Sequence, residues 1–197
     1  MGALTTPRSA LVDTALRLSR RWCAGHLIDG SPALGHAVKV AHKVDKHLPE
    51  ADPALIAAVI LHDSPYFAPE GTDLDAVLND RLGPAVTRIV RGIEREHQAL
   101  AVAELPKIDV SDPYTVVASA ADKAVSIAAI TRRAGRAPDA GVYWSTRRAS
   151  IKRVPYFCAF ADAAGPHLPA GLARELAAAA LTAHDATAPY RWPLPIR

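Results

Sequence analysis

The sequence is poor in cysteine, methionine and aromatic residues, and it has no long hydrophobic run. Its two cysteines, Cys23 and Cys158, stand far apart, which excludes a disulfide framework and a Cys-x-x-Cys motif; we expect both to be reduced. The Ala-rich run at 176–183 is much shorter than the roughly 20 apolar residues that span a membrane, and no charged-then-apolar leader is evident. These absences predict a cytoplasmic protein with no membrane partner.

Charge of either sign is also modest, because 23 basic residues face 20 acidic ones and the net charge is +3. The basic residues form short clusters without interleaved aromatic residues, and no nucleic-acid-reading motif accompanies them, so we expect no nucleic-acid partner. A single cluster is more often a solvated helix face than a ligand site, although one of them could hold the phosphates of a nucleotide. The clusters lie at 17–21, 132–133, 147–148 and 152–153.

What the chain has in abundance is alanine and leucine at helical spacing, with 50% apolar residues overall. Asp52-Pro53 and Asp112-Pro113 are helix-start signals, in which a capping side chain precedes a proline in the first turn. The pattern predicts an all-α, single-domain protein, with the domain at 1–185 and an extended tail at 186–197. Helices are expected over 7–25, 33–48, 53–63, 73–82, 84–93, 113–134, 142–163 and 169–184, with a loop over 94–112 in which a short helix is an open alternative.

Four polar residues stand out against these apolar helices: His36, the adjacent pair His62 and Asp63, and Asp122. A carboxylate buried in mid-helix needs a partner, since removing it from water costs several kcal/mol. Lys123 is a poor partner for Asp122 because it points about 100° away around the helix. Two imidazoles and two carboxylates suit Mn²⁺, Fe²⁺ or Zn²⁺ with coordination positions left open.

The alternative for each of these residues is a hydrogen bond to a neighbouring backbone or side-chain group. That alternative is the better one for any single residue, whereas a shared metal ion explains all four at once. The remaining histidines are expected at the surface or at helix caps; they are His26, His42, His47, His97, His167 and His184.

The order His, His-Asp, Asp resembles that of the HD-domain phosphohydrolases. Residues 30–41 are similar to the Gly-Thr-Pro-Tyr-Ile-x-His-Pro-x-x-Val-Ala segment of the Rel/SpoT and small alarmone hydrolases, and residues 57–63 are similar to their Ala-Ala-x-Leu-Leu-His-Asp helix. Residues 119–123 resemble the segment that carries the last metal ligand in that family. The resemblance covers about residues 11–180.

This resemblance implies a helical HD-type bundle in which Mn²⁺ is held by His36, His62, Asp63 and Asp122. It also implies a small-molecule nucleotide substrate such as ppGpp, hydrolysed at a phosphate or pyrophosphate ester. The oligomeric state stays open, with a homodimer as one option.

The sequence departs from the family at the residues that handle water and the base. Tyr66 and Phe67 replace a Glu-Asp pair that activates the attacking water in the family, and Ser126 replaces an asparagine. Candidate catalytic residues are therefore Asp63, Glu70 as the nearest other carboxylate, and Tyr66. Candidate substrate-binding residues, chosen as polar or cationic groups near helix ends, are Lys123, Ser126, Arg147, Arg148 and Lys152.

Three functions fit these observations. The first is hydrolysis of a nucleotide phosphate or pyrophosphate ester. The second is an HD-type hydrolase repurposed for another phosphorylated nucleoside, for instance in specialised metabolism. The third is a catalytically weak regulatory or antitoxin-like binding protein, which the loss of the Glu-Asp pair favours and the retained ligand set opposes.

Overall fold

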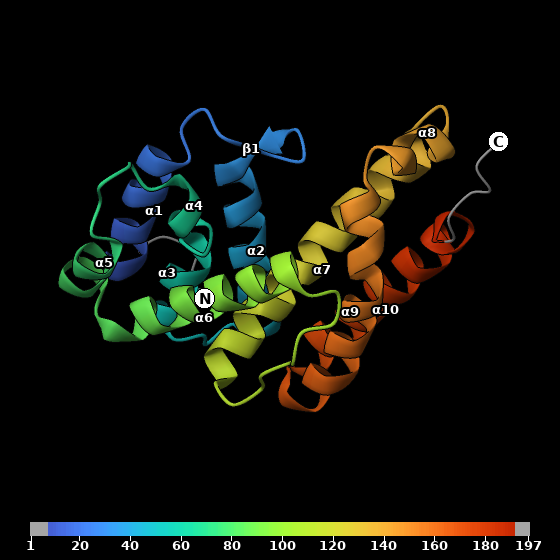
Figure 1. The fold of residues 1–197 in the computed structure, drawn as a ribbon. Coiled ribbons are helices and arrows are strands. Elements are labelled where there is room, and N and C mark those ends of the chain that lie inside the picture. Colours follow the sequence, from blue (N-terminus) through green and yellow to red (C-terminus); the bar gives the residue numbers. More distant parts are fainter. Residues whose placement is uncertain (1–7, 192–197) are drawn as a thin grey trace.

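A computed structural model describes residues 8–191 and shows a helical protein with one small hairpin (Figure 1). The prediction of an all-α fold is confirmed. The elements are α1 (Ala10–Trp22), β1 (Leu27–Ile28), β2 (Ser31–Pro32), α2 (Ala33–His47), α3 (Pro53–Ile60), α4 (Ser64–Phe67), α5 (Leu74–Leu82), α6 (Pro84–Val102), α7 (Pro113–Arg136), α8 (Ala140–Ser145), α9 (Arg148–Ala164), α10 (Ala170–Thr187) and two 3-10 turns, η1 (Gly165–His167) and η2 (Ala188–Tyr190).

Helix α3 is the buried centre of one half of the molecule. All of its residues after Pro53 are buried, and α1, α2, α6 and α7 all contact it (Figure 1). Asp52 begins this helix by accepting a hydrogen bond from the Ala54 amide, 2.8 Å away, and Pro53 follows at the first helical position. A helix that is apolar on every side is stable only inside a core, so α3 fixes the positions of the helices around it.

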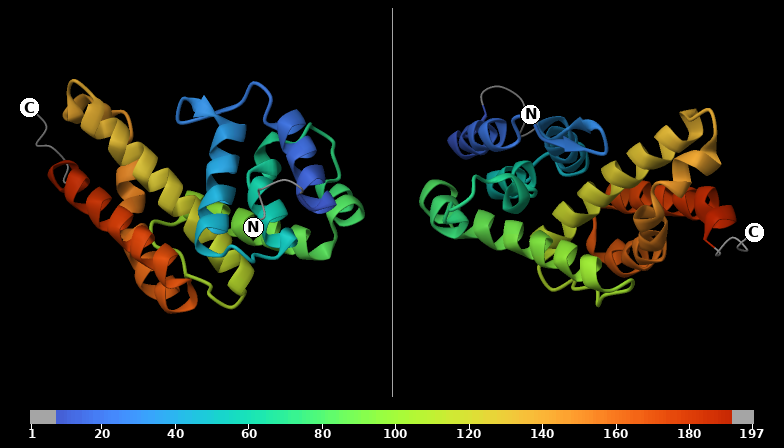
Figure 2. Two further views of the ribbon diagram at one scale, coloured as in Figure 1. Left: turned by 180° about the vertical axis from the view of Figure 1, so that it is seen from behind. Right: turned by 45° about the horizontal axis from the view of Figure 1, so that its top comes forward.

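The other half of the molecule is an arm made of α7, α9 and α10 (Figure 2). Helix α7 starts in the first half and extends along α10, and the short α8 lies at the far end of the arm. A separate small core supports that end, formed by Ile130, Ala134, Trp144 and Ile151. Because α7 belongs to both halves, the middle of this helix lies where the two halves meet.

The turn between α1 and α2 is a two-stranded antiparallel hairpin that pairs Leu27 with Pro32 and Ile28 with Ser31. Asp29 and Gly30 at its tip have φ of 48° and 75°. Two consecutive positive φ values are typical of the tight hairpin turn that favours Asp-Gly.

Three expectations from the sequence were wrong in detail. Helix α6 continues through Val102, so residues 94–102, expected as a loop with at most a short helix, extend the preceding helix. The expected helix over 142–163 is two helices, α8 and α9, separated at Thr146 and Arg147. Helix α10 and η2 carry helical structure through Tyr190, so residues 186–190 of the expected extended tail are helical, and residues 192–197 lie outside the described residues.

Within residues 8–191, no helix is both long enough and apolar enough to cross a membrane.

Helices α6 and α7 approach each other closely at Gly92, where an added Cβ would lie 2.8 Å from both Cγ2 and Oγ1 of Thr115. Thr115 cannot rotate freely, because its hydroxyl donates to Asp112. We therefore expect Gly92→Ala to lower the free energy of unfolding by about 1–3 kcal/mol, measured by urea denaturation. The matched control is Gly135→Ala in α7, where the Cβ meets nothing within 4 Å, and it should be neutral or stabilising.

Candidate metal centre

The first part of the site is the turn that follows α3. The helix ends at Ile60, and His62 folds back so that its Nδ1 lies 2.7 Å from the backbone carbonyl oxygen of Val59. A carbonyl oxygen can only accept, so Nδ1 carries the proton and donates it. The neutral His62 ring therefore has a free electron pair on Nε2, which is the arrangement that metal-binding histidines adopt.

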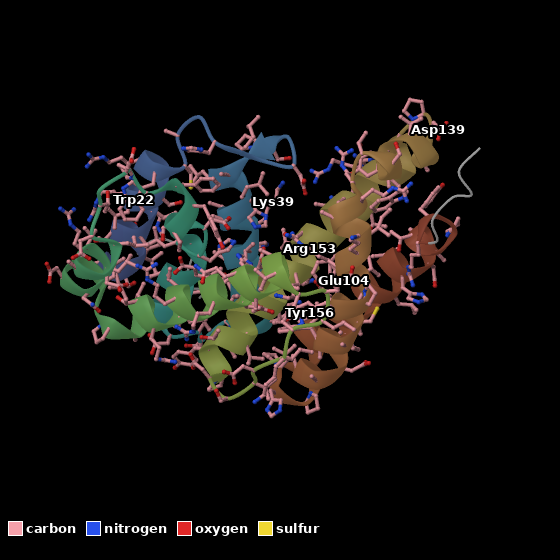
Figure 3. All side chains as sticks on the ribbon, in the orientation of Figure 1. Trp22, Lys39, Glu104, Asp139, Arg153 and Tyr156 are labelled. Carbon is pink, nitrogen blue, oxygen red and sulfur yellow. The ribbon has the colours of Figure 1, made fainter. Side chains whose placement is uncertain are left out.

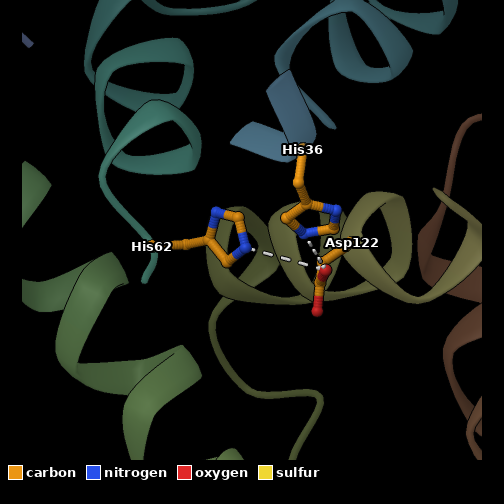
Figure 4. Close-up of side chains that lie close together, drawn as sticks. All are labelled: His36, His62 and Asp122. Atoms are coloured by element: carbon orange, nitrogen blue, oxygen red, sulfur yellow. Dashed lines mark hydrogen bonds and ion pairs between the residues drawn. The ribbon is translucent and has the colours of Figure 1, made fainter. Parts of the chain in front are cut away.

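His36 and Asp122 bring the second and third parts of the site. His36 lies in the first turns of α2, and its Nε2 is 3.0 Å from Asp122 Oδ1 in the middle of α7. The same carboxylate oxygen is 3.6 Å from His62 Nε2, and all three side chains point toward one another (Figure 4). One ligand atom from each of the three lies within 4.8 Å of the others, which is close enough for a shared metal ion.

Asp63 contacts this cluster through His62. Its Oδ2 lies 3.1 Å from His62 Nε2, yet neither atom has a hydrogen-bond partner, although both are buried. Two electron-pair donors that face each other out of water repel, and only a proton or a cation between them relieves this. The donor set of imidazole nitrogens and carboxylate oxygens fits Mn²⁺, Fe²⁺ or Zn²⁺.

The ionisation of these groups shows how strongly the site attracts positive charge. Burial opposes the protonated form of His62, but the carboxylates of Asp63 and Asp122 raise its pKa well above the ordinary value. Burial also opposes the ionised form of Asp122, but contacts with His36, His62 and His97 hold its pKa well below the ordinary range. Burial also opposes ionisation of Asp63, but His62 lowers its pKa, so both aspartates are carboxylates at neutral pH and can bind a cation.

His97 belongs to the site, contrary to the expectation that it lies at the surface or a cap. Its Nε2 is 3.5 Å from Asp122 Oδ2, and its ring stacks on that of Tyr66. It was missed because the polar stretch after Ile93 reads as a loop, whereas α6 continues and carries His97 back toward α7. The sequence did carry one indication of this: His97 stands four residues after Ile93, so in a helix that continued it would lie on the same face.

The cluster lies at the polar end of a cavity of about 470 Å³, which is within the roughly 300–1,000 Å³ of small-molecule sites. The cavity lies between the hairpin and α4 on one side and α6, α7 and α9 on the other. Its lining comprises Ile28, Asp29, His36, Asp63, Tyr66, Phe67, His97, Leu100, Ala101, Asp122, Lys123, Ser126, Ile127, Ile130, Trp144, Ser150, Arg153, Val154, Phe157 and Ala183.

The structure separates the three candidate catalytic residues. Asp63 and Tyr66 line the cavity, together with Phe67, whose ring stacks on that of His26. Glu70 lies in the exposed loop between α4 and α5 and does not line the cavity. Glu70, which is close to the metal-ligand pair in the sequence, is therefore not brought into the cavity by the fold.

The candidate phosphate ligands divide in the same way. Ser126 lines the cavity and donates a hydrogen bond to Asp122, at 3.2 Å. Lys123 also lines it, but only 3% of its side chain is exposed, and its Nζ lies 2.7 Å from Glu96 Oε1 and donates to Ser119 Oγ. The Glu96 carboxylate also accepts a hydrogen bond from the Tyr156 hydroxyl, which completes a buried network behind Asp122.

The other three candidates, Arg147, Arg148 and Lys152, are not in the cavity wall. The Arg147 guanidinium lies 3.9 Å from the centroid of the Tyr143 ring, Arg148 donates to the Tyr190 carbonyl, and Lys152 is exposed near Glu104. Arg153, one position further along α9, is the arginine that lines the cavity instead. The division of 142–163 into two helices changes which residues face inward.

No protein-family model matches this chain, and a comparison with curated proteins finds no match. Among solved structures, a metazoan orthologue of SpoT, described as hydrolysing ppGpp and acting in starvation responses, superimposes with a TM-score of 0.59 at 18% identity, covering 95% of this chain and 100% of that chain. This chain has the fold of that hydrolase. The resemblance to HD-domain hydrolases that the sequence predicted is confirmed at the level of the fold.

We expect a divalent metal ion to stabilise the protein. At a Mn²⁺ concentration about 100 times Kd, binding to one site adds about 2.7 kcal/mol, which corresponds to a rise in Tm of about 5–10 °C for a chain of this size. Thermal unfolding with and without Mn²⁺ measures this. Asp122→Asn should abolish the rise, whereas the matched change Asp80→Asn, on the exposed side of α5, should keep it. An equal rise in both variants would rule out Asp122 as a ligand.

The buried contact of Lys123 with Glu96 predicts that Lys123 contributes more to the free energy of unfolding than to substrate binding. Glu96→Gln leaves an unpaired charge on Lys123 in the interior, and we expect it to lower the free energy of unfolding by about 3–5 kcal/mol. Glu96→Gln combined with Lys123→Met removes the charge and should recover much of that loss. Urea denaturation of both variants tests this, and equal stabilities would contradict it.

Proposed function

We propose that this protein is a metal-dependent phosphohydrolase that acts on a nucleotide phosphate or pyrophosphate ester. The observation that carries the proposal is the meeting of His36, His62 and Asp122 at the polar end of a cavity of small-molecule size. The fold shared with a ppGpp-hydrolysing enzyme supports it. We expect its substrate to be a small molecule that binds in the cavity between α4 and α9.

The residues that would hold the metal ion are His36, His62, Asp63 and Asp122, and we expect Mn²⁺, with Fe²⁺ or Zn²⁺ as alternatives. When bound, such an ion polarises a phosphoryl oxygen and makes a water molecule more acidic. The protein contributes orientation: the Val59 carbonyl fixes the tautomer of His62, and Ser126 holds the Asp122 carboxylate by a hydrogen bond. These contacts position the ligands before any substrate arrives.

Among the polar groups of the cavity wall, His97 and the Tyr66 hydroxyl are the ones we assign to a substrate oxygen, since Glu70 lies outside the cavity. Burial and the carboxylates of Glu94 and Asp63 raise the pKa of Tyr66. The Tyr66 hydroxyl therefore stays protonated at neutral pH and acts as a hydrogen-bond donor. His97, which faces both Tyr66 and Asp122, is placed to contact the same substrate oxygen.

A regulatory, catalytically weak binding protein is the second candidate function. One observation favours it: within the described residues, the carboxylates that line the cavity are Asp29, Asp63 and Asp122, and none stands where the related enzymes have their Glu-Asp pair. Asp29 has its own partner, the Arg133 guanidinium at 3.3 Å. In this case the metal ligands would position a bound phosphate without rapid turnover.

The experiment that separates the two functions is a hydrolysis panel with the Mn²⁺-loaded protein. Phosphate and pyrophosphate release would be assayed with ppGpp, ppApp, NADPH and nucleoside mono- and triphosphates. We expect release from at least one of them. Asp63→Ala should lower the hydrolysis rate roughly 100-fold or more, because removing a metal ligand costs at least as much activity as removing a residue that hydrogen-bonds to one. Asp80→Ala should match the wild type. Activity that is indifferent to Asp63→Ala would exclude metal catalysis.

A further inference from the structure

The substrate-binding part of the cavity has an unequal distribution of charge, and it points to a substrate class. We infer that the substrate carries a single phosphate group, anchored between the metal ligands and Arg153, and a largely apolar or aromatic body that fills the rest of the cavity. This inference rests on the proposed function and narrows it, because it disfavours substrates with several phosphate groups.

Much of the cavity wall contributed by α6, α7, α8 and α9 is apolar. Six of the lining side chains on these helices are aliphatic or aromatic, and the hydrogen-bond donors beside them, apart from the histidine and the charged residues, are the Trp144 indole and the hydroxyls of Ser126 and Ser150. The six are Leu100, Ile127, Ile130, Trp144, Val154 and Phe157. A phosphate group placed against such a wall would lose its water without gaining a partner, which costs several kcal/mol. A flat ring system would instead gain contact area there.

The positive charge available to phosphate is small. Apart from histidines, the basic residues in the lining are Lys123 and Arg153. The Lys123 ammonium is already engaged by Glu96 and Ser119, and the ring of Phe160 lies under it, with the centroid 4.5 Å away. Its remaining capacity for an anion is therefore low, since the Glu96 carboxylate already neutralises it.

Arg153 is different, because its guanidinium is exposed and has no ion pair or hydrogen bond with any other residue in 8–191. It lies near the middle of the molecule, on α9 one turn from Tyr156 (Figure 3). Arg153 lines the same cavity as Tyr66, Asp63 and Asp122, and a guanidinium that faces a cavity can bind a phosphate in bidentate fashion.

A divalent ion and one guanidinium match one phosphate group. The charges that could hold a second group are engaged elsewhere: Arg133 faces Asp29, and Arg147 and Arg148 contact Tyr143 and Tyr190. A nucleotide with two diphosphate groups would have to leave one of them unpaired in the cavity or exposed outside it. A nucleoside monophosphate or another aromatic phosphate monoester fits without this penalty.

The test compares probes that differ in one feature. Binding to the Mn²⁺-loaded protein is measured by calorimetry for guanosine 3′-monophosphate, guanosine 3′,5′-bis(diphosphate) and glycerol 1-phosphate, because the divalent ion is one of the two groups assigned to the phosphate. We expect the monophosphate to bind at least tenfold more tightly than either of the others. The bis(diphosphate) brings phosphate charge for which the cavity has no partner, and glycerol 1-phosphate lacks the aromatic body. Tighter binding of the bis(diphosphate) or of glycerol 1-phosphate, equal binding of all three, or no binding of the monophosphate would overturn the inference.

The role of Arg153 is tested in the same assay. Arg153→Ala should weaken binding of the monophosphate about tenfold or more, and Arg153→Lys should recover part of the loss, since lysine keeps the charge but not the bidentate geometry. The matched control is Arg136→Ala, which removes an exposed arginine at the end of α7 and should bind as the wild type does. Equal weakening in Arg136→Ala, or none in Arg153→Ala, would contradict the assignment.

Hydrolysis assays separate this inference from the proposed function. Mn²⁺-dependent release from the bis(diphosphate) at a higher kcat/KM than from the monophosphate would leave the hydrolase standing and overturn the single-phosphate inference. If no phosphoester is hydrolysed with any divalent ion, the proposed function fails. The binding ratios above still decide which phosphate pattern the cavity takes.

Discussion

The buried carboxylate of Asp122 is the constraint on which the site depends. It lies in the middle of α7, where its neighbours in the helix are almost all apolar, so it is stable only if other elements bring partners to it. His36 arrives from α2, His62 from the turn after α3, His97 from α6, and Ser126 from the next turn of α7 itself. Three segments that are distant from α7 in the sequence are therefore tied to one position on it.

The same arrangement explains why the cavity has two unlike ends. The histidine partners of Asp122 come from the half of the molecule organised around α3, whereas the arm supplies the aliphatic residues Ile127, Ile130 and Val154 together with polar residues such as Ser150 and Arg153. Helix α7 passes between the two halves and contributes to both ends. A ligand that bridges them has a phosphate at one end and an apolar body at the other, which is the pattern proposed for the substrate.

Much of the site could be predicted because burial makes polar residues conspicuous. His36, His62 and Asp122 stand in apolar runs, and the structure brings these three together. The roles of the other candidates stay predictions, although the fold has sorted them: Asp63, Tyr66, Lys123 and Ser126 face the cavity, while Glu70, Arg147, Arg148 and Lys152 do not line it. Local chemistry alone does not distinguish a charged residue that faces a ligand from one that faces water.

The sequence by itself determined the helical class, the strong helix starts at Asp52 and Asp112, and the metal-ligand candidates, because capping and burial are local properties. Only the tertiary structure decided that α6 continues far enough to place His97 beside Asp122, that Lys123 is engaged by Glu96, and that Arg153 faces the cavity. The physical reason is that these outcomes depend on packing between helices distant in the chain. Long-range contacts stabilise a polar helix end or fix a side chain's direction in a way that no local pattern records.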